Sequence, residues 1–138
     1  MLGGTEYVAE ACEETLTAIG HHAKVHLQPK FDQIPHENQT WLICTSTHGA
    51  GDLPDNIISF VKDLKAYDQK LSTTRFLVIG VGDSSYDTFC FAAKKIENTL
   101  LSKGCVNKIQ LLTIDMLQDI DPELAAQQHL NDNKDLLY

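Results

Sequence analysis

The stretch Trp41–Asn56, WLICTSTHGAGDLPDN, changes within a few residues from apolar to polar and glycine-rich. Its first part, WLICTS, is a continuous apolar run of the kind that forms a strand buried on both faces. A helix is expected from about Asp55, because the apolar residues after it recur at helical spacing: Ile57, Phe60, Val61 and Leu64. The order strand, polar loop, helix is typical of an α/β protein, with the loop at the carboxyl end of the strand.

The same alternation continues on both sides of this stretch. The expected elements are a helix over Thr5–Ile19 ended by Gly20, strands over Ala23–Gln28 and Arg75–Gly82, a helix over Phe89–Leu100 closed by Gly104, a strand over Lys108–Asp115 and a helix from Asp121. Apolar strands that alternate with amphipathic helices predict one α/β domain over residues 1–138, with a doubly wound parallel sheet and helices on both faces.

Composition and charge limit the kinds of partner and the cellular location that the sequence suits. The 138 residues carry a net charge of −8, which argues against nucleic acid as a partner and favours a basic protein partner. The sequence contains neither an apolar run of membrane-spanning length nor a signal-peptide pattern. The four cysteines lack the paired spacing of a metal site and are expected to be reduced thiols, which favours a cytoplasmic location.

Three polar segments are expected at one edge of the sheet, where open α/β sheets bind their ligands. Gly3, Gly4 and Thr5 open a helix and offer free backbone N–H groups and a hydroxyl to a phosphate. The loop over residues 45–51 supplies hydroxyls, backbone hydrogen-bonding groups and glycines, which suit it to cover one face of a planar heterocyclic ligand. In the third segment, GDSSYDTFC, Tyr86 is suited to stacking on the other face of that ring, and a surface tyrosine is the alternative.

Together, LGGTEYVAE, TSTHGAGDLPDN and GVGDSSYDTFC resemble the three FMN-binding segments of flavodoxins, and they are most similar to the short MioC-type members. The resemblance implies a non-covalently bound FMN and an electron carrier that passes through semiquinone and hydroquinone states. The implied partners are a flavodoxin/ferredoxin reductase-type donor and a redox acceptor enzyme, and both are expected to dock on an acidic surface of this chain.

The resemblance also implies roles for residues. Those matching the phosphate loop are Gly3, Gly4 and Thr5. Those matching the inner flavin loop are Ser46, Thr47, His48, Gly49, Ala50 and Gly51, where the Gly49 peptide turns toward the flavin. Those matching the outer loop are Gly82, Asp83, Tyr86, Phe89 and Cys90, with Tyr86 as the stacking ring and Cys90 in a packing role.

At its start the chain departs from this pattern. The family has the strand order 2-1-3-4-5, and the central first strand and the beginning of the phosphate loop would precede Leu2. The expectation is therefore an N-terminally incomplete flavodoxin that holds FMN weakly or not at all.

Other functions remain open at this point. One is a non-flavin protein-interaction module on a flavodoxin-like scaffold, and another is a fragment unable to hold FMN. A hydrolase built from Ser46, His48 and Asp52 is disfavoured because three residues of one loop rarely form a catalytic triad. The histidines near residues 21–26 are expected to be solvated, since no carboxylate or thiol completes a metal site.

Overall fold

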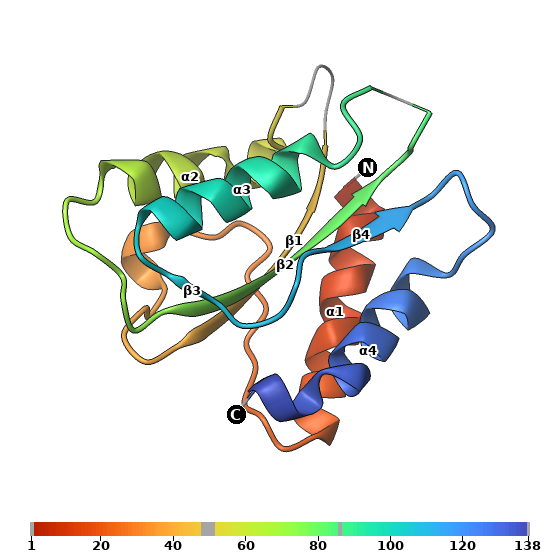
Figure 1. Cartoon of the computed structure of the whole chain (residues 1–138), viewed down its shortest axis with the longest axis horizontal. Helices are drawn as coiled ribbons and strands as arrows, with labels where there is room; N and C mark the ends of the chain where they lie inside the picture. Colours follow the sequence, from red (N-terminus) through yellow and green to blue (C-terminus); the bar gives the residue numbers. More distant parts are fainter. Residues whose placement is uncertain (1, 48–51, 86, 138) are drawn as a thin grey trace.

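The computed structural model describes residues 2–47, 52–85 and 87–137. Its centre is a parallel four-stranded sheet (Figure 1) made of β1 (Thr40–Ser46), β2 (Arg75–Gly82), β3 (Val106–Asn107) and β4 (Leu112–Asp115). Strand β2 pairs with β1 along one edge, and with β3 and then β4 along the other. These strands fill the last three places of the expected 2-1-3-4-5 order.

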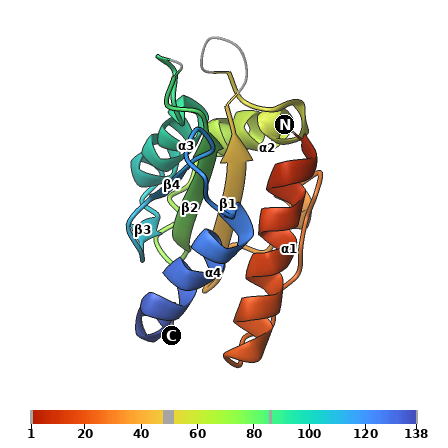
Figure 2. The same ribbon diagram turned by 90° about the vertical axis from the view of Figure 1, so that its right-hand side faces the viewer.

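Two pairs of helices cover the two faces of the sheet. Helices α2 (Asp55–Ala66) and α3 (Phe91–Ser102) lie on one face, and α1 (Leu2–Ala18) and α4 (Pro122–Asp132) lie on the other (Figures 1 and 2). Short 3-10 turns occupy Phe31–Gln33 and Lys134–Leu137. Among the described helices, none is long and apolar enough to cross a membrane.

Strand β2 shows why this layering follows from the sequence. Successive side chains of a strand point to opposite faces, so Phe76 and Val78 join the cluster under α2 and α3, whereas Leu77 and Ile79 join the cluster under α1 and α4. All four are at most 1% exposed. The apolar run RFLVIGVG therefore forms the centre of both halves of the core.

The ends of the helices agree with the sequence signals. Gly20 and Gly104 follow α1 and α3 with φ of +100° and +85°, a conformation that favours glycine. The carboxylate of Asp121 caps α4 by accepting hydrogen bonds from the backbone N–H groups of Glu123 and Leu124. Helix α1 starts three residues earlier than predicted, at Leu2.

The prediction of a strand over Ala23–Gln28 is wrong for the described structure, in which this segment has no strand assignment. Its side chains still alternate, because His21, Ala23 and Val25 are half-buried whereas the residues after each of them are exposed. The expected alternation is therefore present, but a strand is defined by its ladder, and none is formed here.

Of the strand predicted over Lys108–Asp115, only the second half forms, as β4, and β3 lies just before the predicted range. Arg75 pairs with Val106 and Ile79 pairs with Leu112, so β2 advances by 79 − 75 = 4 residues while its partner advances by 112 − 106 = 6. Residues 108–111 are therefore outside the ladder with β2, and two of them are in excess of the residues opposite, as in a β-bulge. Ile109, in this interruption, is 3% exposed and packs in the core beneath α1 and α4.

Candidate functional site

One edge of the sheet gathers the segments that the sequence singled out. The carboxyl ends of the parallel strands point to the same side, and the amino end of α1 lies at that side too (Figures 1 and 2). An open α/β sheet binds its ligands in this place.

The first turn of α1 is suited to an anion. Its amino-terminal N–H groups have no acceptor within the helix, and the helix dipole makes this end positive. The turn holds no acidic residue, whereas α2 and α4 carry Asp55 and Glu123 in theirs. Gly3 and Gly4 belong to this turn, and Thr5 lines the same groove as Ser46 at the end of β1. The structure thus brings the predicted phosphate segment to the same edge of the sheet as the end of β1.

Thr47 connects the end of β1 to helix α3. Its hydroxyl oxygen accepts a hydrogen bond of 3.1 Å from the backbone N–H of Ala92, in the first turn of α3. Before it, Thr45 and Ser46 are buried, and the Thr45 hydroxyl donates to the Ser46 carbonyl at 3.0 Å. The hydroxyls of Thr45 and Thr47 therefore fix the backbone around them, and Thr47 positions the start of α3.

Gly82, at the end of β2, is enclosed by the loop that follows it. A Cβ at this position would lie 3.1 Å from Cδ1 of Phe89 and 3.2 Å from Sγ of Cys90. Its carbonyl accepts a hydrogen bond of 2.7 Å from the N–H of Met116. Three of the predicted outer-loop residues are thus in one packed unit.

Cys90 packs in the interior of this unit. It is fully buried, and its backbone has φ of 54° just before α3. Burial raises the pKa of its thiol to about 11, so the thiol is protonated at neutral pH. This supports the packing role expected for Cys90 and argues against a nucleophilic one.

Two carboxylates order the loop after β2. Asp83 accepts hydrogen bonds from the N–H and the hydroxyl of Ser85, at 2.9 and 2.6 Å. Asp115, at the end of β4, accepts from the N–H groups of Ser84 and Leu117, both at 3.0 Å. Hydrogen bonds from Ser84 hold the pKa of Asp115 below its ordinary value.

Asp115 was missed by the sequence analysis as a site residue. The signal for it was available, because an acid at the end of the last predicted strand lies at the ligand-binding edge of the sheet. Five predicted site residues lie outside the described residues: His48, Gly49, Ala50, Gly51 and Tyr86.

Comparison with known proteins agrees with this arrangement. The model of the flavodoxin family matches residues 1–127. The chain belongs to the flavodoxin family. It is 44% identical over 129 residues to the MioC homolog of Pasteurella multocida (strain Pm70), which covers 94% of this chain and 87% of that protein. It is 39% identical over 136 residues to protein MioC of Escherichia coli (strain K12), which covers 99% of this chain and 92% of that protein.

A solved flavodoxin confirms the fold. A mutant of the Pseudomonas aeruginosa flavodoxin superimposes with a TM-score of 0.85 at 27% identity, over 99% of this chain and 93% of that one. The predicted α/β flavodoxin fold and the predicted similarity to MioC-type members are therefore both confirmed. Membership of the family implies a flavin cofactor, typically FMN. The described residues fit its phosphate through the acid-free first turn of α1.

Proposed function

We propose that this chain is an FMN-binding electron carrier that takes electrons from a reductase and passes them to acceptor enzymes. The observation that carries the proposal is the meeting of three segments at one sheet edge. These are the first turn of α1, the end of β1 and the β2–α3 loop, with Thr5 and Ser46 lining one groove. FMN supplies the electron-transfer chemistry when bound, and the chain supplies binding and orientation.

Each segment has its own task in this proposal. The backbone N–H groups of Gly3, Gly4 and Thr5 hold the phosphate at the positive end of α1. Ser46 and Thr47, with His48, Gly49, Ala50 and Gly51, form the inner side of the flavin site. Gly82, Asp83, Tyr86, Phe89 and Cys90 form its outer side.

A partner surface is proposed beside the outer loop. Four large apolar side chains that follow β4 are 40–62% exposed: Met116, Leu117, Ile120 and Leu124. The exposed carboxylates of Asp119 and Asp121 lie among them in the sequence. Exposed apolar residues rimmed by charge are typical of a protein-binding surface. This surface adjoins the site, because the Met116 N–H bonds the Gly82 carbonyl, and it suits a reductase or an acceptor that presents basic residues.

The proposal is tested by titrating the protein with FMN and, separately, with riboflavin, while flavin absorbance and fluorescence are recorded. FMN is expected to bind with quenching of its fluorescence, and riboflavin about 10-fold more weakly, because it lacks the phosphate held by α1. Thr5→Ala is expected to weaken FMN binding without changing riboflavin binding. Thr17→Ala, at an exposed position of the same helix, is the matched control and is expected to change neither.

Equal affinity for FMN and riboflavin would show that the first turn of α1 does not bind the phosphate. A folded protein that binds neither flavin would overturn the electron-carrier proposal. It would instead support an interaction module on the flavodoxin scaffold or a fragment unable to hold FMN.

A further inference from the structure

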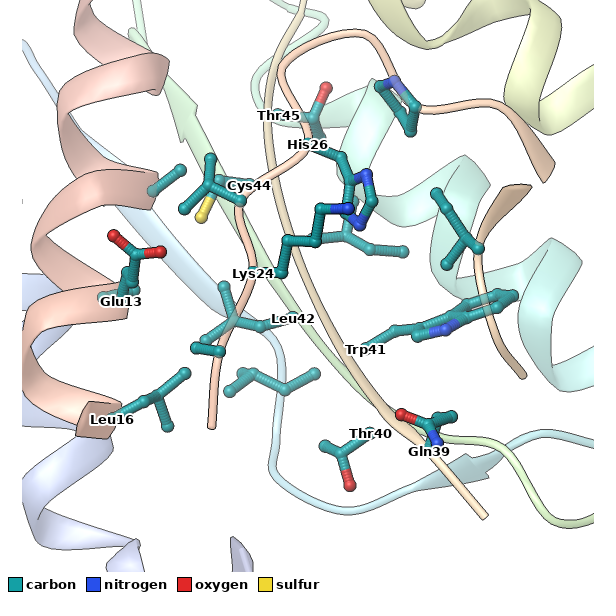
Figure 3. Close-up of a pocket in the computed structure, with 18 of the residues that line it drawn as sticks. Glu13, Leu16, Lys24, His26, Gln39, Thr40, Trp41, Leu42, Cys44 and Thr45 are labelled. Atoms are coloured by element: carbon teal, nitrogen blue, oxygen red, sulfur yellow. The ribbon is translucent and has the colours of Figure 1, made fainter. Parts of the chain in front are cut away.

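Cys12 and Cys44 face one another where helix α1 packs on the sheet. Successive side chains of a strand point to opposite faces, and Leu42 and Cys44 of β1 lie on the face covered by α1 and α4. Cys12, with Val8 one turn before it, is on the side of α1 that packs against this face. Figure 3 shows the sulfur of Cys44 on the side of β1 that faces α1. The fold thus brings together two cysteines that are distant in the sequence.

The two thiols are in hydrogen-bonding contact. The Cys44 thiol donates to the sulfur of Cys12, and this hydrogen bond lowers the pKa of Cys12 below its ordinary value and raises the pKa of Cys44. Cys12 is therefore the member of the pair that ionises first, with the neutral thiol of Cys44 beside it. A thiolate is the nucleophilic form of cysteine, so Cys12 is the more reactive of the two.

The other two cysteines lie in different surroundings. Burial raises the pKa of Cys90 and that of Cys105 to about 11, so both thiols are protonated at neutral pH. Cys105 packs in the core cluster under α2 and α3, on the opposite face of the sheet from the pair. Cys44 is half-buried, whereas the other three cysteines are buried, so solvent has access to the pair beside Cys44.

We propose that Cys12 and Cys44 are a redox-active dithiol, which hydrogen peroxide oxidises to a disulfide that joins α1 to β1. In the first step the Cys12 thiolate attacks one peroxide oxygen, the O–O bond breaks, and Cys12 becomes a sulfenic acid while hydroxide leaves. In the second step the Cys44 sulfur attacks the sulfenic sulfur, the S–S bond forms, and the hydroxyl leaves with the Cys44 proton as water. The two thiols lose two electrons and two protons, and the peroxide is reduced to two molecules of water.

The disulfide would connect two elements that reach the ligand-binding edge of the sheet. Helix α1 begins at Leu2 and β1 ends at Ser46, both at this edge. A covalent bond between them would fix how the two ends are placed relative to each other. A dithiol also transfers electrons in pairs, so it is a redox centre of a different kind from a flavin that carries single electrons. The inference does not depend on the proposed electron-carrier function, because neither step needs a flavin.

The test treats the flavin-free chain with hydrogen peroxide, blocks the remaining thiols with iodoacetamide and maps disulfides by mass spectrometry after digestion with trypsin. Trypsin cleaves after lysine and arginine, which places each of the four cysteines on a different peptide. The expected product is a monomer with a cross-link between the peptides of Cys12 and Cys44, which dithiothreitol reverses. The cross-link is expected to form about 10-fold or more faster than Cys90 or Cys105 is oxidised.

Variants test the order of the two steps. Cys44→Ser keeps a hydrogen-bond donor beside Cys12 but removes the second thiol, so a sulfenic acid is expected to accumulate on Cys12, where dimedone traps it. Cys12→Ser is expected to show at least about 10-fold less trapping on Cys44, because the remaining thiol is the less acidic one. Cys105→Ala, at a buried cysteine outside the pair, is the matched control and is expected to form the cross-link at the native rate.

Should either serine variant fail to fold, the peptide map of the unaltered chain still decides. Four results would each overturn the inference: no cross-link at millimolar peroxide, a cross-link between two chains, a cross-link through Cys90 or Cys105, or oxidation of all four thiols at one rate. The measurements contain no flavin, so their outcome is separate from that of the FMN titration.

Discussion

Gly82 joins strand β2 to the outer loop at a position without room for a side chain. In Gly82→Ala the new Cβ would lie 3.1–3.3 Å from Phe89 Cδ1, Cys90 Sγ and the Cys90 backbone nitrogen, so the loop must shift. The expected cost is about 1–3 kcal/mol of unfolding free energy, as for other overpacked sites. Urea unfolding measures it. The double variant Gly82→Ala/Cys90→Ala, in which the sulfur contact is removed, is expected to lose less than the sum of its single variants. Strict additivity would show that Cys90 does not limit the space.

Asp115, at the end of β4, is expected to make the stability of the fold depend on pH. Hydrogen bonds from Ser84 lower the pKa of this carboxyl in the folded chain below its ordinary value of 3.8. Because this pKa is lower in the folded chain, the ionised carboxylate stabilises the fold at pH values above the pKa of the unfolded chain. The stabilisation is lost as the pH falls through the pKa of the folded chain. The thermal midpoint of the native chain should therefore drop more steeply below about pH 4 than that of Asp115→Asn. Asp119→Asn, in the same loop, is the control and should keep the native slope. Parallel curves for native protein and Asp115→Asn would contradict the prediction.

At the scale of elements, helix α3 depends on a residue 45 positions earlier in the chain. The Thr47 hydroxyl is the acceptor for the Ala92 N–H. Thr47→Val keeps the shape but leaves this donor without its acceptor, with an expected loss of about 1–2 kcal/mol in unfolding free energy. Thr47→Ser keeps the hydroxyl and is expected to lose less. Urea unfolding and the exchange rate of the Ala92 amide give the comparison. Equal losses in both variants would show that the hydroxyl is not the dominant contribution of Thr47 to stability.

The helices and strands also show which structural features local sequence patterns can predict. Local signals placed the helices and β2, because hydrophobic period, Gly20 and the Asp121 cap act within a few residues. They did not show that residues 23–28 form no ladder, nor that residues 108–111 separate β3 from β4 outside the ladder with β2. Both depend on neighbours distant in sequence. The same limit applies to the site, where the end of the last predicted strand indicates the position of Asp115 but not its hydrogen bond from Ser84 in another loop.

At the scale of the whole molecule, charge links the cofactor to the partner. The net charge of −8 opposes adding an electron to bound FMN. One like charge about 10 Å away costs roughly 0.4 kcal/mol in a water-like dielectric, and several acids together cost about 1–3 kcal/mol. Since about 1.4 kcal/mol corresponds to about 59 mV for one electron, the acids of the proposed electron carrier are expected to lower its FMN potential by roughly 50–130 mV.

The response to salt distinguishes the long-range electrostatic effect of the acidic residues from that of short-range contacts with the cofactor. Raising the ionic strength from about 0.01 to 1 M shortens the screening length from about 30 to about 3 Å. The FMN potential should therefore rise by tens of millivolts, while association with a reductase that presents basic residues slows at least 10-fold. Potentiometric titration and stopped-flow reduction measure the two effects. Because an uncharged osmolyte at equal osmolality leaves the screening length unchanged, it serves as the control. A potential and an association rate that both ignore salt would show that the acidic surface acts on neither the cofactor nor the partner.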